Sequence, residues 1–348
     1  MTVRGIDKLR RISRRVIYKF TPRAIVLLYH RVIDLPSDPQ LLCVSRQHFT
    51  EHLEVIRECC RTIQMKTLGK ALQHRNRGEC AIIITFDDGY ADNLYNAKPL
   101  LERYDIPATM FVTSGYLGSK REFWYDGLER IFLHGEILPE KLRLQINGHW
   151  REWYVGPAVG WSDGAYRNFR EWNISRKDDP SMRHSLYRSL FQILHPLPDG
   201  ERTKIMEALA LWAGVDPIQR PTHRTLSPDE LIRLADGGLV EVGSHTVSHP
   251  LLSAIPVAAQ TDEISRSKTH LEEILGHPVS SFAYPFGGRS HYTNQTVTAV
   301  REAGFEWACS SFAGVVSRDT DPWQLPRFVI RDWDRDEFAR ALEGWIGG

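Results

Sequence analysis

The sequence of 348 residues has no stretch that would carry it into or across a membrane. A transmembrane helix needs about 20 consecutive apolar residues, and no run in this chain approaches that length. A secretory signal would need an uninterrupted apolar region of roughly 7–15 residues followed by small residues at a cleavage site, and the N-terminus has neither. We therefore expect a cytoplasmic chain that is soluble or, at most, associated with the inner membrane surface.

An excess of one charge sign is also missing. The 44 Lys and Arg residues are balanced by 43 Asp and Glu residues, which leaves a net charge of +1. Proteins that bind nucleic acid through their overall charge carry a clear excess of basic residues. This balance therefore gives no reason to expect DNA or RNA as a partner.

Cysteine is scarce and shows no pairing pattern. The 5 cysteines are odd in number and include no Cys-x-x-Cys spacing. That argues against a disulfide framework and against a zinc knuckle. We expect reduced, mostly buried thiols, as in a cytoplasmic protein.

The one local excess of charge lies at the N-terminus. Residues 4–23 are rich in Lys and Arg, with only Asp7 opposing them, and apolar residues are interleaved at helical spacing. This pattern predicts a basic amphipathic arm over residues 1–22, outside the main domain. The arm could pack on that domain or contact a membrane surface, and the sequence leaves both interpretations open.

Short apolar runs rich in β-branched residues alternate with segments of helical periodicity. The runs predict seven strands, at residues 24–29, 81–86, 108–113, 239–243, 281–284, 305–310 and 325–330. Helices are expected at residues 45–60, 93–104 and 261–275, and Ser227 followed by Pro228 marks another helix start. This alternation implies parallel strands joined by helical crossovers, and therefore a (β/α) barrel or a doubly wound sheet.

Residues 118–225 break this alternation and are predicted to be an insertion in the main domain, residues 23–348. Within it, Asn147 and Gly148 stand between two strand-like segments and predict a β-hairpin with a type I′ turn. Residues 182–194 and 202–213 are expected to be helical. The many Trp and Tyr residues could form a core of the insertion or stack on sugar rings, and for any single Trp the core is favoured.

Two adjacent carboxylates follow the second predicted strand. The strand ending at Phe86 is continued by Asp87 and Asp88. In a parallel barrel the active site gathers at the C-terminal ends of strands, where this pair falls. Adjacent carboxylates repel each other, so one could bind a metal while its neighbour takes a proton. A plain Asp-Asp-Gly turn is the competing explanation.

Two histidines four residues apart follow the fourth predicted strand. His245 and His249 would lie on one face if the chain turned helical there, so both imidazoles could reach one metal ion. With one aspartate they would provide three protein ligands and leave a position open for water, as in catalytic zinc sites. A lone histidine is usually a packing or surface residue, but a pair at a strand end is harder to explain in that way.

These motifs resemble those of the polysaccharide deacetylases, the NodB-type domain of carbohydrate esterase family 4. Residues 85–89 (Thr-Phe-Asp-Asp-Gly) look like the first motif, His245-x-x-x-His249 like the second, and residues 282–287 (Phe-Ala-Tyr-Pro-Phe-Gly) like the third. The resemblance covers roughly residues 23–338 without the insertion. It implies a distorted (β/α) barrel of about seven parallel strands. It also implies a hydrolase that removes an N-acetyl or other small N-acyl group from an amino sugar in a polysaccharide, glycolipid or other glycan precursor.

The resemblance further implies a role for each site residue. Asp88, His245 and His249 would hold a divalent metal ion, and Asp87 would be the catalytic base. The backbone N–H of Phe286 would donate to the oxyanion of the tetrahedral intermediate. Zinc is the expected metal, although cobalt, nickel and manganese would also suit two histidines and an aspartate.

The chain departs from the family pattern in two places. The third motif usually begins with an arginine that orients the catalytic base, but Ala283 stands there, and we expect Arg327 to take over this task. The final Leu-x-His motif, which supplies the general acid, is missing. His30 is the expected replacement, because relatives acting on extracellular poly-N-acetylglucosamine resemble this chain in carrying Tyr-His at the first strand; His291 is next. A surface arginine and a packing histidine are the respective alternatives.

Other functions stay open on the sequence alone. An amidohydrolase acting on a cyclic amide or a small N-acyl metabolite would use a related metal barrel. A carbohydrate-binding protein that has lost its chemistry would lack Asp87 or a metal ligand, yet all four positions are present. A glycoside hydrolase would place its paired carboxylates on different strands, about 5–10 Å apart. The expected partner is a carbohydrate that carries an N-acyl amino sugar.

Overall fold

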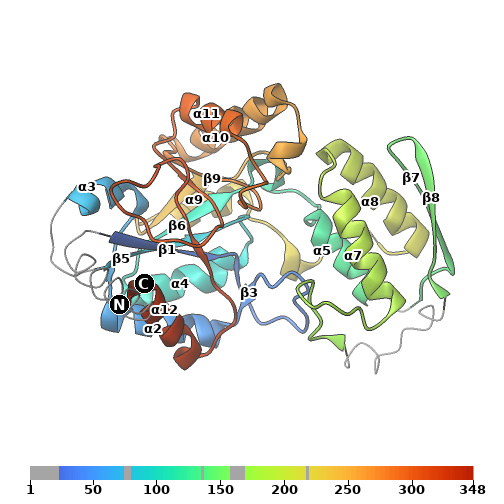
Figure 1. The fold of residues 1–348 in the computed structure, drawn as a ribbon, viewed down its shortest axis with the longest axis horizontal. Helices are drawn as coiled ribbons and strands as arrows, with labels where there is room; N and C mark the ends of the chain where they lie inside the picture. The colour runs from blue at the N-terminus through green and yellow to red at the C-terminus, as the bar shows by residue number, and fades with distance from the viewer. Residues whose placement is uncertain (1–22, 74–79, 135–136, 157–168, 217–218, 348) are drawn as a thin grey trace, which may run out of the picture.

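The computed structural model describes residues 23–73, 80–134, 137–156, 169–216 and 219–347. The strands of the main sheet are β1 (Arg23–Tyr29), β4 (Arg61–Thr62), β5 (Cys80–Phe86), β6 (Ala108–Val112), β9 (Val240–Ser244), β10 (Ser281–Ala283), β11 (Trp307–Cys309) and β12 (Phe328–Val329). The helices that accompany them are α2 (Arg46–Cys59), α3 (Leu68–Gln73), α4 (Lys98–Tyr104), α9 (Pro228–Ala235), α10 (Val257–Leu275), α11 (Asn294–Glu302) and α12 (Arg335–Gly347). The short strands β2 (Arg31–Val32) and β3 (Cys43–Val44) pair with each other. The remaining elements are α5 (Trp124–Glu129), β7 (Lys141–Ile146), β8 (His149–Tyr154), α7 (Met182–Leu194) and α8 (Asp199–Ala213), which lie together on the right of Figure 1.

The main sheet is parallel and has the order β11-β10-β9-β6-β5-β1-β12, with β4 paired to the first half of β5. The order follows the chain from β1 to β11, and β12 returns to lie beside β1. The outer strands approach each other through a bridge between Cys309 and Leu325, which lies just ahead of β12. This is the order of an incomplete barrel of seven parallel strands, so the predicted barrel is confirmed and the doubly wound sheet is excluded.

The period-two alternation of the strands separates the barrel interior from the layer that packs on the helices. On β5, Ile82 and Ile84 belong to the large hydrophobic cluster that includes the surrounding helices. Ala81 and Ile83 belong to a smaller cluster with members from β1, β6 and β11, which fills the interior. Continuing the inward series by two residues at a time leads to Asp87. The strand pattern alone therefore aims this carboxylate toward the barrel axis.

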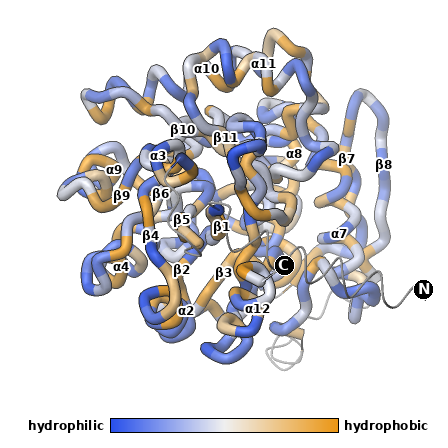
Figure 2. Tube along the Cα trace, turned by 60° about the vertical axis from the view of Figure 1, so that its left-hand side comes forward, coloured by the Kyte–Doolittle hydropathy of each residue, from blue (hydrophilic) through white to orange (hydrophobic). Residues whose placement is uncertain are grey.

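The segment between β6 and α9 has a hydrophobic core of its own. Leu128 of α5, Leu142 of β7 and Leu190 of α7 are fully buried in this second cluster. The hairpin β7-β8 turns at Asn147 and Gly148, whose φ values of 51° and 77° fit the predicted type I′ turn. Figure 2 shows β8 as a nearly continuous hydrophilic strand at the edge of the molecule. One face of the hairpin therefore packs on the helices and the other faces solvent.

The aromatic residues of this segment divide between its core and its surface. Trp124, Tyr125 and Trp172 are buried in the second cluster, as favoured for the insertion's tryptophans. Trp150 and Tyr154 of β8 are 59% and 60% exposed. Trp161 lies outside the described residues.

Some elements differ from the prediction. The strand predicted at residues 325–330 is reduced to Phe328–Val329. Pro326 shortens it because proline has no N–H to donate to a neighbouring strand. The helix predicted at residues 93–104 begins as a π-helical turn over Asn93–Ala97, followed by α4 with Pro99 in its first turn. A proline there removes one backbone hydrogen bond of the helix. This loss favours the switch between π-helical and α-helical hydrogen bonding at this point.

The predicted arm over residues 1–22 lies outside the described residues, so its helix and its contacts are not tested. Among the residues that are described, no helix combines the length and the apolar content that a membrane span needs.

Candidate active site

The predicted site residues gather at the C-terminal ends of the barrel strands. His30 follows β1, Asp87 and Asp88 follow β5, and His245 and His249 follow β9. All five line one cavity of about 470 Å³. Residues distant in sequence are brought together because parallel strands end at the same rim of the barrel.

Asp87 is held by two hydrogen bonds from Arg327. Nη1 donates to Oδ1 and Nη2 donates to Oδ2, both at 2.7 Å. The guanidinium is oriented in turn by Ser310 O, 2.6 Å from Nε, and by Thr85 Oγ1, 3.1 Å from Nη1. Burial acts to raise the pKa of Asp87, but the charges of Arg327 and His245 hold it below its usual value. The carboxylate is therefore ionised at neutral pH and can accept a proton.

Asp88 and the two histidines could together hold a metal ion. Their ligand atoms lie within 4.8 Å of one another, and all three side chains are buried. Asp88 Oδ1 is 3.5 Å from His245 Nε2 and 3.3 Å from His249 Nε2. This buried oxygen has no hydrogen-bond partner among the described residues, which is costly unless a cation compensates it. Two imidazole nitrogens and one carboxylate oxygen fit a divalent ion such as zinc.

The second motif forms a loop, not the helix that its four-residue spacing suggested. Thr246 and His249 have φ values of 65° and 54°, which a regular right-handed helix excludes. The imidazoles of His245 and His249 still converge, with ring centroids 4.9 Å apart. His245 Nδ1 lies 2.7 Å from Ala283 O, so Nδ1 carries the proton and Nε2 keeps a lone pair for a ligand bond.

Uncommon backbone conformations concentrate at this rim. The described non-glycine residues with positive φ include Asp88 at 76°, Thr246 at 65°, His249 at 54° and Phe286 at 61°. Each such residue costs on the order of 1–3 kcal/mol and persists only where its surroundings fix it. Gly89 follows with φ 82°, and a Cβ there would lie 2.9 Å from a side-chain atom of β6. All three motifs thus carry residues that are held in place against a conformational cost.

Phe286 and His30 also line the cavity. Phe286 O accepts a hydrogen bond from Ser311 Oγ at 2.6 Å, while the Phe286 N–H makes no backbone hydrogen bond within the described part of the chain. That N–H is available to an oxyanion. Burial lowers the pKa of His30, although the charges of Asp88 and Asp87 act in the opposite direction.

Sequence reasoning missed the cavity residues that other segments supply. Tyr125 and His195 come from the insertion, Gln40 from the loop between β2 and β3, and Arg331 from the segment after β12. Tyr125 donates its hydroxyl to Asp88 Oδ2 at 3.0 Å. None of the four belongs to a recognisable motif. The only sequence signal for the insertion residues was the richness of residues 118–225 in aromatic side chains.

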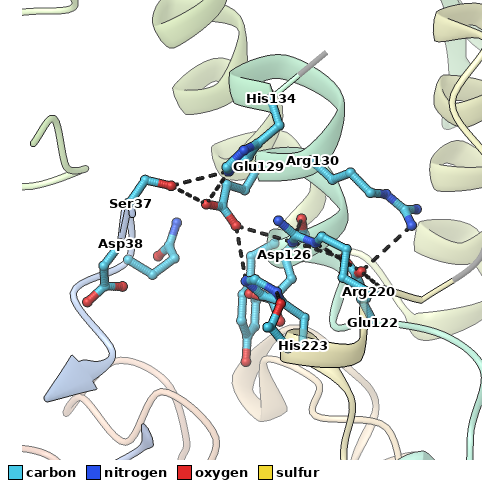
Figure 3. Close-up of polar contacts among 12 residues, drawn as sticks. Ser37, Asp38, Glu122, Asp126, Glu129, Arg130, His134, Arg220 and His223 are labelled. Atoms are coloured by element: carbon cyan, nitrogen blue, oxygen red, sulfur yellow. Dashed lines mark hydrogen bonds and ion pairs between the residues drawn. The ribbon is translucent and has the colours of Figure 1, made fainter. Parts of the chain in front are cut away.

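A second group of potential metal ligands lies within the insertion. Asp126, Glu129 and His223 also place ligand atoms within 4.8 Å of one another. Figure 3 shows Arg220 beside them: its Nη2 is 3.2 Å from Glu129 Oε2, and His223 Nε2 is 3.4 Å from the same oxygen. A guanidinium at this distance supplies the positive charge that a metal ion would bring. This group is therefore better explained as a buried ion network.

Comparison with known proteins shows the family and the fold. The family model described as polysaccharide deacetylase matches residues 74–143 and 205–308, which is half of the chain. YxkH of Bacillus subtilis (strain 168), whose name places it with the polysaccharide deacetylases, is 28% identical over 127 residues. Those residues are 35% of this chain and 44% of YxkH, so the match spans less than half of that relative.

Solved structures show the same fold. The deacetylase PplD of Streptococcus pyogenes, in complex with acetate, superposes with a TM-score of 0.56 at 16% identity, over 92% of this chain and 98% of PplD. IcaB from Ammonifex degensii gives a TM-score of 0.57 at 18% identity, over 94% of this chain and 98% of IcaB. At such identities these matches show that the fold is the same. The chemistry of the site has to be inferred from the residues described above.

The expected metal site is open to direct test. We expect His245→Ala and His249→Ala to lower the content of divalent metal far below stoichiometric, because each removes one of three ligands. The measurement is elemental analysis of purified, dialysed protein. The exposed His277, replaced by Ala, is the control and should leave the metal content unchanged. Wild-type metal content in both site variants would contradict the site.

Proposed function

Because the chain belongs to the polysaccharide deacetylase family, we propose that it is a metal-dependent hydrolase that removes an N-acetyl, or another small N-acyl, group from an amino sugar. The substrate would be a polysaccharide, a glycolipid or another glycan precursor. The observation that supports this most strongly is the separation of the two adjacent carboxylates. Asp87 is bound by Arg327, whereas Asp88 faces the paired histidines.

In this proposal three side chains hold the cation: Asp88 through Oδ1, and His245 and His249 through Nε2. A divalent ion bound there supplies Lewis-acid chemistry, which polarises an amide carbonyl and makes water more acidic. Zinc is our choice among the divalent ions, because a buried set of two imidazoles and one carboxylate with an open position is typical of catalytic zinc.

The chain's own residues would perform the proton transfers. Asp87 takes a proton from a water molecule as its oxygen adds to the acyl carbon. The carbonyl oxygen becomes an oxyanion, toward which the N–H of Phe286 can donate. The carbon–nitrogen bond then breaks, and His30 gives a proton to the leaving amine. The products are a carboxylate, acetate in the simplest case, and a free amino sugar.

The rest of the cavity suits a carbohydrate. Gln40, His195, Ser311 and Arg331 place amide, imidazole, hydroxyl and guanidinium groups in its wall, and Phe191 adds an aromatic ring. Polar groups of this kind fix the hydroxyl and amide groups of a ligand, while aromatic faces contact its apolar side. We also propose a cytoplasmic location, since five free cysteines suit a reducing compartment.

The rival functions predict different products. A carbohydrate-binding protein without activity would have no need for the buried base with its own arginine. An amidohydrolase acting on a cyclic amide would open a ring without forming acetate. The arrangement of Asp87 and Arg327 therefore favours catalysis, and the products decide between the two hydrolases.

The direct test is acetate release by the purified protein. The panel contains N-acetylglucosamine oligomers, an N-acetylglucosamine glycolipid and a nucleotide-linked N-acetylglucosamine, each assayed with and without chelator. We expect equal amounts of acetate and free amine from at least one substrate, loss of both with chelator, and recovery with added zinc. Ring opening of a cyclic amide, with no acetate from any acetamido sugar, would reject the proposal.

Substitutions of the two aspartates should impair different properties of the protein. Asp87→Asn should keep the metal and lower kcat by at least ~10²-fold, the usual scale for a lost general base. Asp88→Asn should weaken metal affinity, because a neutral amide is a poorer ligand than a carboxylate. Metal titration and steady-state kinetics on both variants check this. Equal metal affinity in the two would show that the roles are wrongly divided.

The pH profile tests Arg327 and His30. Arg327 lowers the pKa of Asp87, so Arg327→Ala should raise it and move the acidic limb of kcat/KM to higher pH. Arg327→Lys keeps a positive charge and should move that limb less.

His30→Ala should lower kcat, leave the metal in place and remove the alkaline limb set by the acid. If the alkaline limb persists in His30→Ala, His291 is the next residue to replace.

A further inference from the structure

The insertion reaches the metal-binding residues at two places. Tyr125 of α5 donates its hydroxyl to Asp88 Oδ2 at 3.0 Å. Arg202 of α8 donates from Nη2 to Ser248 O at 3.0 Å and from Nη1 to His249 O at 3.2 Å. Both side chains are almost fully buried. One contact holds a carboxylate ligand, and the other holds the backbone of a histidine ligand.

Tyr125 determines which oxygen of Asp88 is left for a cation. Its hydroxyl occupies Oδ2, while Oδ1 has no hydrogen-bond partner among the described residues. Oδ1 is also the oxygen that lies 3.5 Å and 3.3 Å from the Nε2 atoms of His245 and His249. A carboxylate fixed in this way presents one oxygen to the point between Asp88, His245 and His249. Partners that orient metal ligands in this manner usually change metal affinity about 10–100-fold when they are removed.

The loop that carries His249 is held from both sides. On the barrel side, Glu263 of α10 accepts hydrogen bonds from the N–H groups of Val247 and Ser248, each at 2.8 Å. On the other side, Arg202 binds the carbonyl oxygens of Ser248 and His249. His249 has φ 54°, a conformation that persists only when its surroundings hold it. Arg202 thus helps to fix the backbone on which a ligand depends.

The helix that carries Tyr125 is itself anchored by the ion network of Figure 3. Glu122, just ahead of α5, binds Arg220 through both carboxylate oxygens, with distances of 3.1 and 3.0 Å. Glu129, at the end of α5, contacts the same guanidinium at 3.2 Å. Arg220 lies on the segment that returns to the barrel. These ion pairs hold the helix that carries Tyr125 against the segment around Arg220.

We propose that the insertion completes the metal site, with Tyr125 and Arg202 as positioning residues that raise the affinity for the cation without ligating it. The inference rests on the proposed metal dependence of the enzyme. It gives residues 118–225 a part in the chemistry, beyond forming one wall of the cavity.

The test measures metal affinity in the full chain. Zinc is titrated into metal-free protein in competition with a chromophoric chelator, for the wild type, Tyr125→Phe and Arg202→Gln. Tyr125→Phe keeps the ring that stacks on Phe123 and removes only the hydroxyl. We expect each variant to raise the dissociation constant for zinc by about 10-fold or more.

Two matched variants in the same region serve as controls. Tyr116→Phe removes the hydroxyl of another buried tyrosine, whose ring also stacks on Phe123. Arg188→Gln removes a guanidinium that donates to the carbonyl oxygens of Ile174 and Arg176, inside the insertion. Neither residue contacts Asp88, His245 or His249, and both variants should bind zinc as the wild type does.

Thermal unfolding in chelator separates positioning from folding. A metal-free melting temperature close to that of the controls, together with weakened zinc binding, supports the inference. Wild-type zinc affinity in both Tyr125→Phe and Arg202→Gln would overturn it, as would loss of the metal-free fold in both. A wild-type chain that binds no divalent metal would instead reject the proposed function itself.

Discussion

The site depends on keeping two adjacent, buried carboxylates ionised at the end of one strand. Like charges this close cannot both persist without positive partners. Arg327 satisfies Asp87 with two hydrogen bonds, and the paired histidines hold the pKa of Asp88 well below its usual value against the effect of burial. Breaking a buried ion pair by removing one partner costs about 3–5 kcal/mol, so loss of Arg327 would make an ionised Asp87 costly to bury. In the proposed function, this separation lets one aspartate act as a base and the other as a ligand.

The barrel and the insertion contribute to the site in different ways. Parallel strands bring the motif residues to one rim, and the inward series of β5 aims Asp87 at the barrel axis. The barrel alone would leave Asp88 Oδ2 and the carbonyl of His249 without the partners that Tyr125 and Arg202 provide. In the proposed function, such local contacts set the geometry of the metal ligands within a barrel that the chain shares with solved deacetylases at low identity.

Much of the barrel and of its rim could be predicted from the sequence, because the signals are local. The apolar run before Asp87 marks a buried strand, and the spacing of His245 and His249 predicts two imidazoles that converge, as they do in the structure. The loop conformation of that pair could not be predicted, since it depends on positive φ values at Thr246 and His249 that contacts with other segments maintain. The role of the insertion was hidden for the same reason. Its hydrogen bonds join Tyr125 and Arg202 to positions far along the chain, and neither residue differs in pattern from an ordinary buried side chain.

A crystal structure of the zinc-loaded protein, with anomalous scattering measured at the zinc absorption edge, tests the central claim most directly. We expect one strong anomalous peak, with Asp88 Oδ1 and the Nε2 atoms of His245 and His249 at about 2.0–2.2 Å from the ion. Asp87 should stay bound to Arg327, outside the coordination shell. A peak ligated by Asp87, or one that lies only among Asp126, Glu129 and His223, would contradict the division of the two carboxylates.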